Sequence, residues 1–246
     1  MSILARRRRF LSITAVAVGA ATLLTACGSA DSELPLTGLV LSSDSLPAGY
    51  SVVPADVEDL VAGNRRTLEQ AASVAFTPEG CTPTADAAFT PELDADNTVL
   101  LVAQSDTGTL SELVTTVRRN LDADRRATTG VCAVVTAVPS QGTLAGSRIV
   151  TTSTELPAPS GAAVEQALVL RSDSVTALTG GRVLVRSTLL SNVLVRRPSG
   201  EVVTVQVNVG SPDSGVLPVA PEQITPPLPQ EEYLALVQAA VDRAAR

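Results

Sequence analysis

Three cysteines, Cys27, Cys81 and Cys132, are the side chains of this 246-residue sequence best suited to covalent chemistry. The sequence has no histidine, and all 18 of its basic residues are arginine, so lysine is absent as well. Histidine triads, histidine metal sites, lysine Schiff bases and the lysine of a Walker loop therefore cannot form. A serine nucleophile would lack its usual bases, and the sequence contains no GxSxG motif.

Cys27 ends a segment that is typical of an export signal. Four arginines at positions 6–9 precede an uncharged, mostly apolar stretch from Phe10 to Leu24. This stretch is too short for a permanent transmembrane helix, which needs about 20 residues, and it predicts a secretory signal peptide over residues 1–26. Leu24-Thr25-Ala26-Cys27 is similar to the bacterial lipobox, in which the cysteine thiol receives a diacylglyceryl group and becomes the first mature residue.

A lipidated Cys27 would hold the protein on a membrane. Two or more acyl chains give stable anchoring, so we expect a domain tethered to the extracytoplasmic face of the cell membrane. Cleavage before Cys27 would change the formal charge from -7 to -11, because residues 1–26 contain four arginines and no acidic residue. Such a chain is not expected to bind nucleic acid. Arg7-Arg8-Arg9-Phe10-Leu11 resembles a twin-arginine export signal, and it is equally compatible with a generic positive flank.

Cys81 and Cys132 remain once Cys27 is lipidated. An even pair of cysteines in an exported protein predicts a disulfide. The bridge would close a loop of about 52 residues and stabilise the fold by roughly 4 kcal/mol in the chain-entropy description. The alternative is a reactive or metal-binding thiol pair, which the absence of histidine and of a CxxC motif argues against.

Charged clusters are the remaining candidates for chemistry. An acidic cluster at residues 94–97 could offer oxygens to calcium but lacks the other ligands of an EF-hand loop. A second acidic cluster covers residues 122–124, and arginine pairs occur at 65–66, 118–119 and 196–197. The pairs could bind phosphate or carboxylate, and solvated charge is the alternative for each cluster. Neither a metal nor another cofactor is predicted.

Hydrophobic spacing predicts the elements that position these residues. Thr67-Leu68-Glu69-Gln70 matches a capping box that would open a short helix through Val74. Thr109-Leu110-Ser111-Glu112 matches another, and apolar residues at 110, 113, 114, 117 and 121 share one helical face, so a helix is expected from Thr109 to near Arg126. A last helix is predicted around the apolar stripe that contains Leu234, Val237 and Val241.

Strand-like segments fill most of the rest. Val99–Ala103 is a compact apolar run between polar residues, and it predicts a buried strand. Valine-, leucine- and threonine-rich segments predict further strands over residues 131–138, 147–154, 165–170 and 182–189. Residues 192–197 and 201–209 predict a hairpin, and valine at every second position of its second arm indicates one buried face. The order of elements predicts a single α+β domain in which a twisted antiparallel sheet packs against helices.

Several segments resemble a known family. They are Leu39-Val40-Leu41, Leu46-Pro47-Ala48-Gly49, a Gly80-Cys81 loop before a strand, a helix followed by Cys132, Gln166-Ala167-Leu168-Val169 and Ser191-Asn192-Val193-Leu194-Val195. Together they resemble the extracellular sensor domain of the mycobacterial and actinobacterial PknH-type serine/threonine kinases, and the lipoproteins that carry a PknH-like domain. The resemblance implies a cleft between sheet and helices, binding of an envelope ligand, and no catalytic residues.

The predicted organisation is therefore a signal peptide over 1–26, a lipidated cysteine with a spacer over 27–37, and a PknH-like α+β envelope domain over 38–246. The expected function is a non-enzymatic, membrane-anchored sensor domain of the cell envelope. Its expected partners are the membrane, through the diacylglyceryl anchor at Cys27, and an unidentified envelope ligand or protein. The alternative is a lipid or glycolipid carrier lipoprotein, and a hydrolase is the third class. A carrier needs a large dry cavity, whereas a sensor needs a cleft with a polar rim.

Overall fold

The computed structural model describes residues 33–82, 85–214 and 224–246, and these belong to one compact unit that begins at Glu33. Cys27, the signal peptide and most of the predicted spacer lie outside the described residues. The strands are β1 Ser51–Val53, β2 Val74–Thr77, β3 Thr98–Ser105, β4 Gly108–Thr115, β5 Val134–Pro139, β6 Arg148–Glu155, β7 Val164–Ala177, β8 Val183–Arg196 and β9 Val202–Gly210. The helices are α1 Val57–Ala71, α2 Ala85–Phe89, α3 Leu121–Thr128 and α4 Gln230–Ala244.

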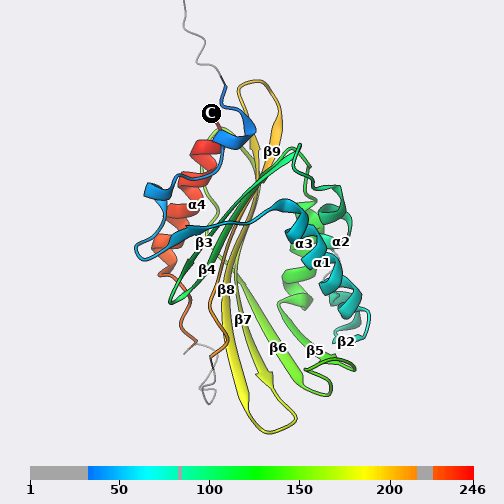
Figure 1. The fold of residues 1–246 in the computed structure, drawn as a ribbon. Coiled ribbons are helices and arrows are strands. Elements are labelled where there is room, and N and C mark those ends of the chain that lie inside the picture. The colour runs from blue at the N-terminus through cyan, green and yellow to red at the C-terminus, as the bar shows by residue number, and fades with distance from the viewer. Residues whose placement is uncertain (1–32, 83–84, 215–223) are drawn as a thin grey trace, which may run out of the picture. The chain divides into compact units, whose positions relative to one another are not determined.

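All nine strands join one open antiparallel sheet in the order β1-β3-β4-β9-β8-β7-β6-β5-β2. Figure 1 shows α4 on one face of this sheet and α1, α2 and α3 on the other. The prediction of a single α+β domain with an antiparallel sheet is confirmed. The hairpin predicted between residues 192–197 and 201–209 is also confirmed, because Arg196 of β8 pairs with Val202 of β9.

The main hydrophobic core lies on the α4 face of the sheet. Side chains alternate between the two faces of a strand, so the four valines at 203, 205, 207 and 209 point together into this core. They meet Tyr233, Val237 and Val241 of α4, the helix that the apolar stripe predicted. A smaller apolar cluster, which includes Val57, Phe89 and Leu113, lies on the opposite face.

The N-terminal segment of the described chain is part of the main core. Leu39 and Leu41 are fully buried there, and Leu34 and Leu36 pack against it. Arg197 also donates a hydrogen bond to the carbonyl of Leu34. Residues 34–41 therefore pack against the sheet and α4 within the described unit.

The helix predicted from Thr109 to Arg126 is wrong. Residues 108–115 form β4, which pairs with β3 along its whole length, and the helix α3 starts only at Leu121. Leu110 and Val114 are four residues apart, so they lie on the same face of the strand and enter the main core, whereas Leu113 enters the cluster on the other face. A strand buried on both faces gives apolar residues at positions that also fit a helical stripe.

The other local differences concern where elements begin and end. Helix α1 starts at Val57, where Asp56 caps it by accepting a hydrogen bond from the amide of Asp59. Thr67, predicted to be a cap, lies inside this helix and donates to the carbonyl of Gly63. The strands predicted over residues 182–189 and 192–197 form one long strand, β8.

Candidate functional site

The centre of the sheet carries polar side chains on the face that α1, α2 and α3 cover. Ser111 of β4 lies directly opposite Asn208 of β9, and Asn208 lies opposite Leu190 of β8. Two residues farther along β9, on the same face, Gly210 lies opposite Thr109 of β4 and opposite Thr188 of β8. The alternation that sends the valines of β9 into the main core therefore sends Asn208 and its neighbours to the opposite face.

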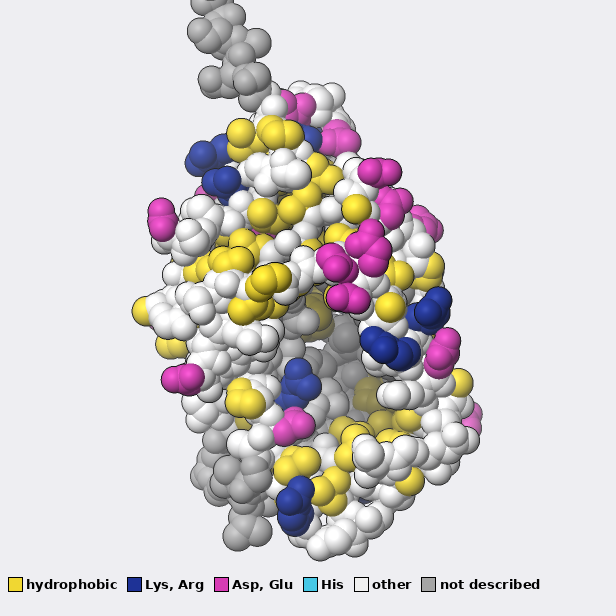
Figure 2. Space-filling view, viewed as in Figure 1, with side chains coloured by type: hydrophobic (Ala, Val, Ile, Leu, Met, Phe, Trp, Pro, Cys, Tyr) yellow, Lys and Arg dark blue, Asp and Glu magenta, His cyan; other side chains and the backbone are white. Residues whose placement is uncertain are grey.

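Two cavities lie over these side chains and share Ser111 and Asn208, so they form one groove. The first, here called the polar lobe, has a volume of about 450 Å³. The second, the apolar lobe, has a volume of about 480 Å³ and lies between the sheet and α1. Figure 2 shows the molecular surface hollowed beside α1. Both volumes fall in the range of small-molecule sites.

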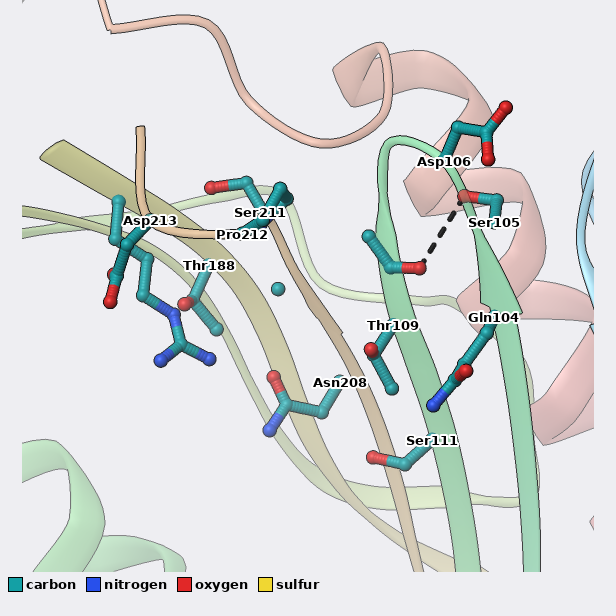
Figure 3. A pocket seen from close by; sticks show the side chains of 13 residues that line it. Gln104, Ser105, Asp106, Thr109, Ser111, Thr188, Asn208, Ser211, Pro212 and Asp213 are labelled. Atoms are coloured by element: carbon teal, nitrogen blue, oxygen red, sulfur yellow. Dashed lines mark hydrogen bonds between the residues drawn. The ribbon is translucent and has the colours of Figure 1, made fainter. Parts of the chain in front are cut away.

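The polar lobe is built mainly from uncharged hydrogen-bonding side chains. Figure 3 shows Asn208 between Thr188 on one side and Thr109 and Ser111 on the other. Its lining comprises Gln104, Ser105, Asp106, Gly108, Thr109, Ser111, Arg186, Thr188, Asn208, Gly210, Ser211, Pro212 and Asp213. These residues come from β3, β4, β8 and β9, from the turn between β3 and β4, and from the segment that follows β9.

Several of these side chains lack protein partners. The Oδ1 atom of Asn208 is buried and accepts no hydrogen bond from the described residues. The side chains of Thr109, Ser111 and Thr188 likewise have no hydrogen-bond partner in the described part of the chain. Thr109 is exposed and Ser111 and Thr188 are half-buried, so only the Oδ1 atom of Asn208 is a buried group without the partner that such groups normally find. The polar lobe offers that acceptor and the three hydroxyl groups to a bound molecule or to water.

Polar residues farther along the same face pair with one another instead. The hydroxyl groups of Thr151 and Ser174 are 2.9 Å apart, and those of Ser153 and Ser172 are 3.1 Å apart. These cross-strand pairs stabilise the sheet. The unpaired side chains are thus a property of the polar lobe and not of the whole polar face.

Arg186 lies across Gly210 at the edge of the polar lobe. A methyl group added at Gly210 would come within 3.2 Å of an Nη atom of Arg186, so glycine leaves room for the guanidinium group. Neither Arg186 nor Asp213, which lines the same lobe, forms an ion pair within the described ranges. The lobe therefore presents both charge signs to a ligand.

The apolar lobe combines an apolar lining with a buried network of hydrogen-bonded polar side chains. Its apolar lining consists of Leu60, Phe89, Leu93, Leu100, Leu113 and Leu190. Arg119 joins this lining and donates two hydrogen bonds to Asp124, of 2.6 and 2.9 Å. Asn192 donates to the same carboxylate, and Gln206 donates to Asn192. This buried polar network fixes the side chains at the floor of the lobe.

Cys81 and Cys132 form the predicted disulfide, which is thereby confirmed. Cys81 lies in the short 3-10 turn Glu79–Cys81 and Cys132 in the turn Gly130–Cys132, and both turns contact α3. The disulfide therefore supports the helix that carries Asp124. It contributes no lining residue to either lobe.

The charged clusters predicted from the sequence mostly have structural partners, and some of them pair with one another, as Arg119 does with Asp124. Asp94 accepts hydrogen bonds from the amides of Asp96 and Asn97 and so closes its own loop. Arg118 and Arg196 both pair with Glu165, and Arg197 pairs with Glu201. No group of three or more potential metal-ligating side chains occurs among the described residues.

Glu112 is an unusual residue on the opposite, α4 face of β4. It is fully buried, and its Oε2 atom accepts a hydrogen bond of 2.7 Å from the amide of Leu41. Burial raises the pKa of Glu112 from 4.5 to about 7, against smaller lowering effects of the Leu41 amide and of the positive charge on Arg243. Its Oε1 atom has no partner among the described residues.

Sequence reasoning missed the groove residues. Thr109 and Ser111 were placed on a helix, and Arg186 was not singled out. One signal was present, since the alternation of valines in residues 202–209 puts Thr204, Gln206 and Asn208 on the wetter face.

No helix in the described part of the chain is long and apolar enough to span a bilayer.

Comparisons with known proteins add no functional assignment. No protein-family model matches the sequence, and no curated protein matches it. The structure is similar to that of an uncharacterized protein from Mycobacterium smegmatis, the Rv0999 ortholog, with a TM-score of 0.47 and 14% sequence identity. The alignment covers 87% of this chain and 99% of that chain. A likeness at this level carries no argument about function, which therefore has to be inferred from the groove.

Proposed function

We propose that this protein is a non-enzymatic envelope lipoprotein, anchored in the cell membrane through Cys27, whose groove binds a small ligand. The observation that carries the proposal is the pair of lobes that meet at Ser111 and Asn208, with unpaired polar side chains in one of them. A cleft with few convergent polar groups and an apolar extension is the usual form of a small-molecule site.

Sensing fits this site better than catalysis does. The sequence contains no histidine or lysine, so Ser111 and the threonines of the groove lack the usual general bases. The resemblance to PknH-type sensor domains supports the same function. The helices on both faces of the sheet support the finer expectation of a sheet packed against helices around a cleft.

A lipid or glycolipid carrier remains the second candidate. The six apolar side chains of the apolar lobe favour it, because they could hold an acyl chain. The polar floor and the buried Arg119–Asp124 pair favour a small polar ligand instead. A dry carrier cavity would be expected to lack such groups.

Native mass spectrometry of the full chain extracted from membranes tests the binding function. We expect a non-covalent adduct on the wild type that is lost in Ser111→Trp, which fills the junction of the lobes. Thr143→Trp, at an exposed site outside both lobes, is the matched control. An adduct with the mass of an acyl lipid would support the carrier, and an adduct that Ser111→Trp retains would contradict binding in the groove.

The anchor has an independent test. Replacing Cys27 by alanine should abolish labelling of the protein with fatty acid and leave the precursor uncleaved by lipoprotein signal peptidase. Labelling that persists in the variant would show that Cys27 is not the lipidated residue.

A further inference from the structure

The polar lobe contains one positive side chain, Arg186, and two negative ones, Asp106 and Asp213, and none of the three forms an ion pair with a described residue. Six other arginines form ion pairs, namely Arg118, Arg119, Arg125, Arg171, Arg196 and Arg197, whereas exposed arginines outside the lobe, such as Arg148 and Arg182, form none with the described residues. Arg186 and Asp213 are exposed as well, so both charges are open to a ligand that enters the lobe.

We propose that the polar lobe binds a zwitterionic ligand, an amino acid or dipeptide with an apolar side chain. Arg186 would bind the carboxylate and Asp213 the ammonium group. This proposal rests on the function proposed above and names the class of ligand. A guanidinium group recognises a carboxylate through two parallel hydrogen bonds, and a ligand that carries both charges satisfies both side chains at once.

Gly210 places the guanidinium group over the floor of the lobe. An Nη atom of Arg186 would lie only 3.2 Å from a Cβ at position 210, and Gly210 pairs with Thr188. Arg186 therefore reaches along the sheet as far as the row of Thr188. A carboxylate bound there would lie within the same row as Thr109, whose hydroxyl group has no partner among the described residues.

The distance to the apolar lobe sets the size of the ligand. Leu190, which lines the apolar lobe, follows Thr188 by two residues on β8. Two residues of a strand span about 7 Å. A leucine residue with its side chain extended, or a dipeptide, covers this distance, and Ser111 and Asn208 lie on the way.

The neutral floor matches the amide groups of such a ligand. The buried Oδ1 atom of Asn208 can accept a hydrogen bond from an ammonium or peptide N–H group. Long acyl chains would leave this acceptor and the hydroxyl groups of Thr109 and Thr188 unpaired, which costs binding energy.

Isothermal titration of the purified full chain with alanyl-leucine tests the proposal. We expect binding that weakens at least tenfold in Arg186→Gln and in Asp213→Asn. Arg182→Gln is the matched control, because Arg182 is an exposed arginine outside both lobes. N-acetyl-alanyl-leucine and alanyl-leucinamide, which lack the ammonium and the carboxylate respectively, should bind at least tenfold more weakly than the dipeptide.

The outcomes separate this proposal from the broader one. Equal binding of alanyl-leucine and both blocked derivatives, lost in Ser111→Trp, would overturn the zwitterion while leaving ligand binding in the groove. Absence of binding by all three peptides would also overturn it, and the adduct found in native extracts would then decide the broader proposal. An effect of Arg182→Gln as large as that of Arg186→Gln would refute the assigned role of Arg186.

Discussion

Replacing Glu112 by glutamine should change how the stability of this protein depends on pH. Glu112 is fully buried on β4, and the amide of Leu41 donates to its Oε2 atom. Arg243 is the charged group that acts on it from α4, and it lowers the pKa less than burial raises it. Glutamine has the shape of the protonated carboxyl group, so the variant should resemble the wild type at low pH.

The sign and size of the effect follow from the pKa. Burial raises the pKa of Glu112 from 4.5 to about 7, so the folded state holds the proton more tightly than the unfolded state. The protonated carboxyl group therefore contributes fully to the free energy of unfolding of the wild type below pH 4.5. This contribution falls as the pH rises and is lost above about pH 7. One pKa unit corresponds to about 1.4 kcal/mol, so the loss is on the order of 3 kcal/mol.

Urea unfolding followed by far-ultraviolet circular dichroism measures this effect, because the chain has no tryptophan for fluorescence. The free energy of unfolding of Glu112→Gln minus that of the wild type should be small at pH 4.5 and should rise by about 3 kcal/mol at pH 8.5. Glu69→Gln, at an exposed position of α1, is the control and should show no such rise. A difference that stays constant would refute the reasoning, because it would mean that folding does not shift the pKa of Glu112. A difference that falls with pH would also refute it, and would mean that the attraction of Arg243 for the ionised carboxylate dominates.

Three further predictions concern stability and use the same unfolding measurement. Replacing Cys81 and Cys132 together by alanine should lower the free energy of unfolding by roughly 4 kcal/mol, since the bridged residues are 51 positions apart; a loss below about 1 kcal/mol would contradict the loop-closure argument. Arg119→Met should cost about 3–5 kcal/mol because it leaves Asp124 buried and unpaired, whereas Arg118→Met, whose side chain is 54% exposed, should cost about 0–1 kcal/mol. Equal costs would show that burial does not govern these pairs. Gly108→Ala should destabilise the sheet, since its Cβ would lie 2.4 Å from the carbonyl oxygen of Gly210, but Gly63→Ala in α1 should stabilise by about 0.5–1 kcal/mol; the same sign for both would contradict the contact argument.

Local patterns predicted those parts of the fold in which one face is buried and the other is wet. The alternating valines of residues 202–209 and the apolar stripe of α4 each have one buried side, and both predictions are confirmed. The pairing of Cys81 with Cys132 followed from counting, because export and lipidation would leave only two cysteines.

The same reasoning failed at β4 because this strand is buried on both faces. Leu110 and Val114 enter the core with α4, while Leu113 enters the cluster with α1 and α2. Strands of this kind have no alternation to distinguish them from a helix. The two-residue turn between Ser105 and Gly108 was the available signal, since Asp106-Thr107 joins two segments that pair in register.

The groove could not be predicted from local patterns, because its residues converge only after the strands have paired. Ser111 and Asn208 are distant in sequence and become neighbours through the register of β4 with β9, and the register of β8 with β9 places Leu190 on the other side of Asn208. Because the sequence predicted a helix that includes Thr109 and Ser111, these residues were not expected in the sheet. The correct alternation in β9 therefore did not indicate which residues of the neighbouring strand lie beside Asn208. Adjacent residues of β4 therefore serve opposite purposes: Glu112 faces the core on one side, and Ser111 joins the two lobes on the other. A substitution at Ser111 can test ligand binding without entering the main core, and Glu112→Gln can test stability without entering the groove.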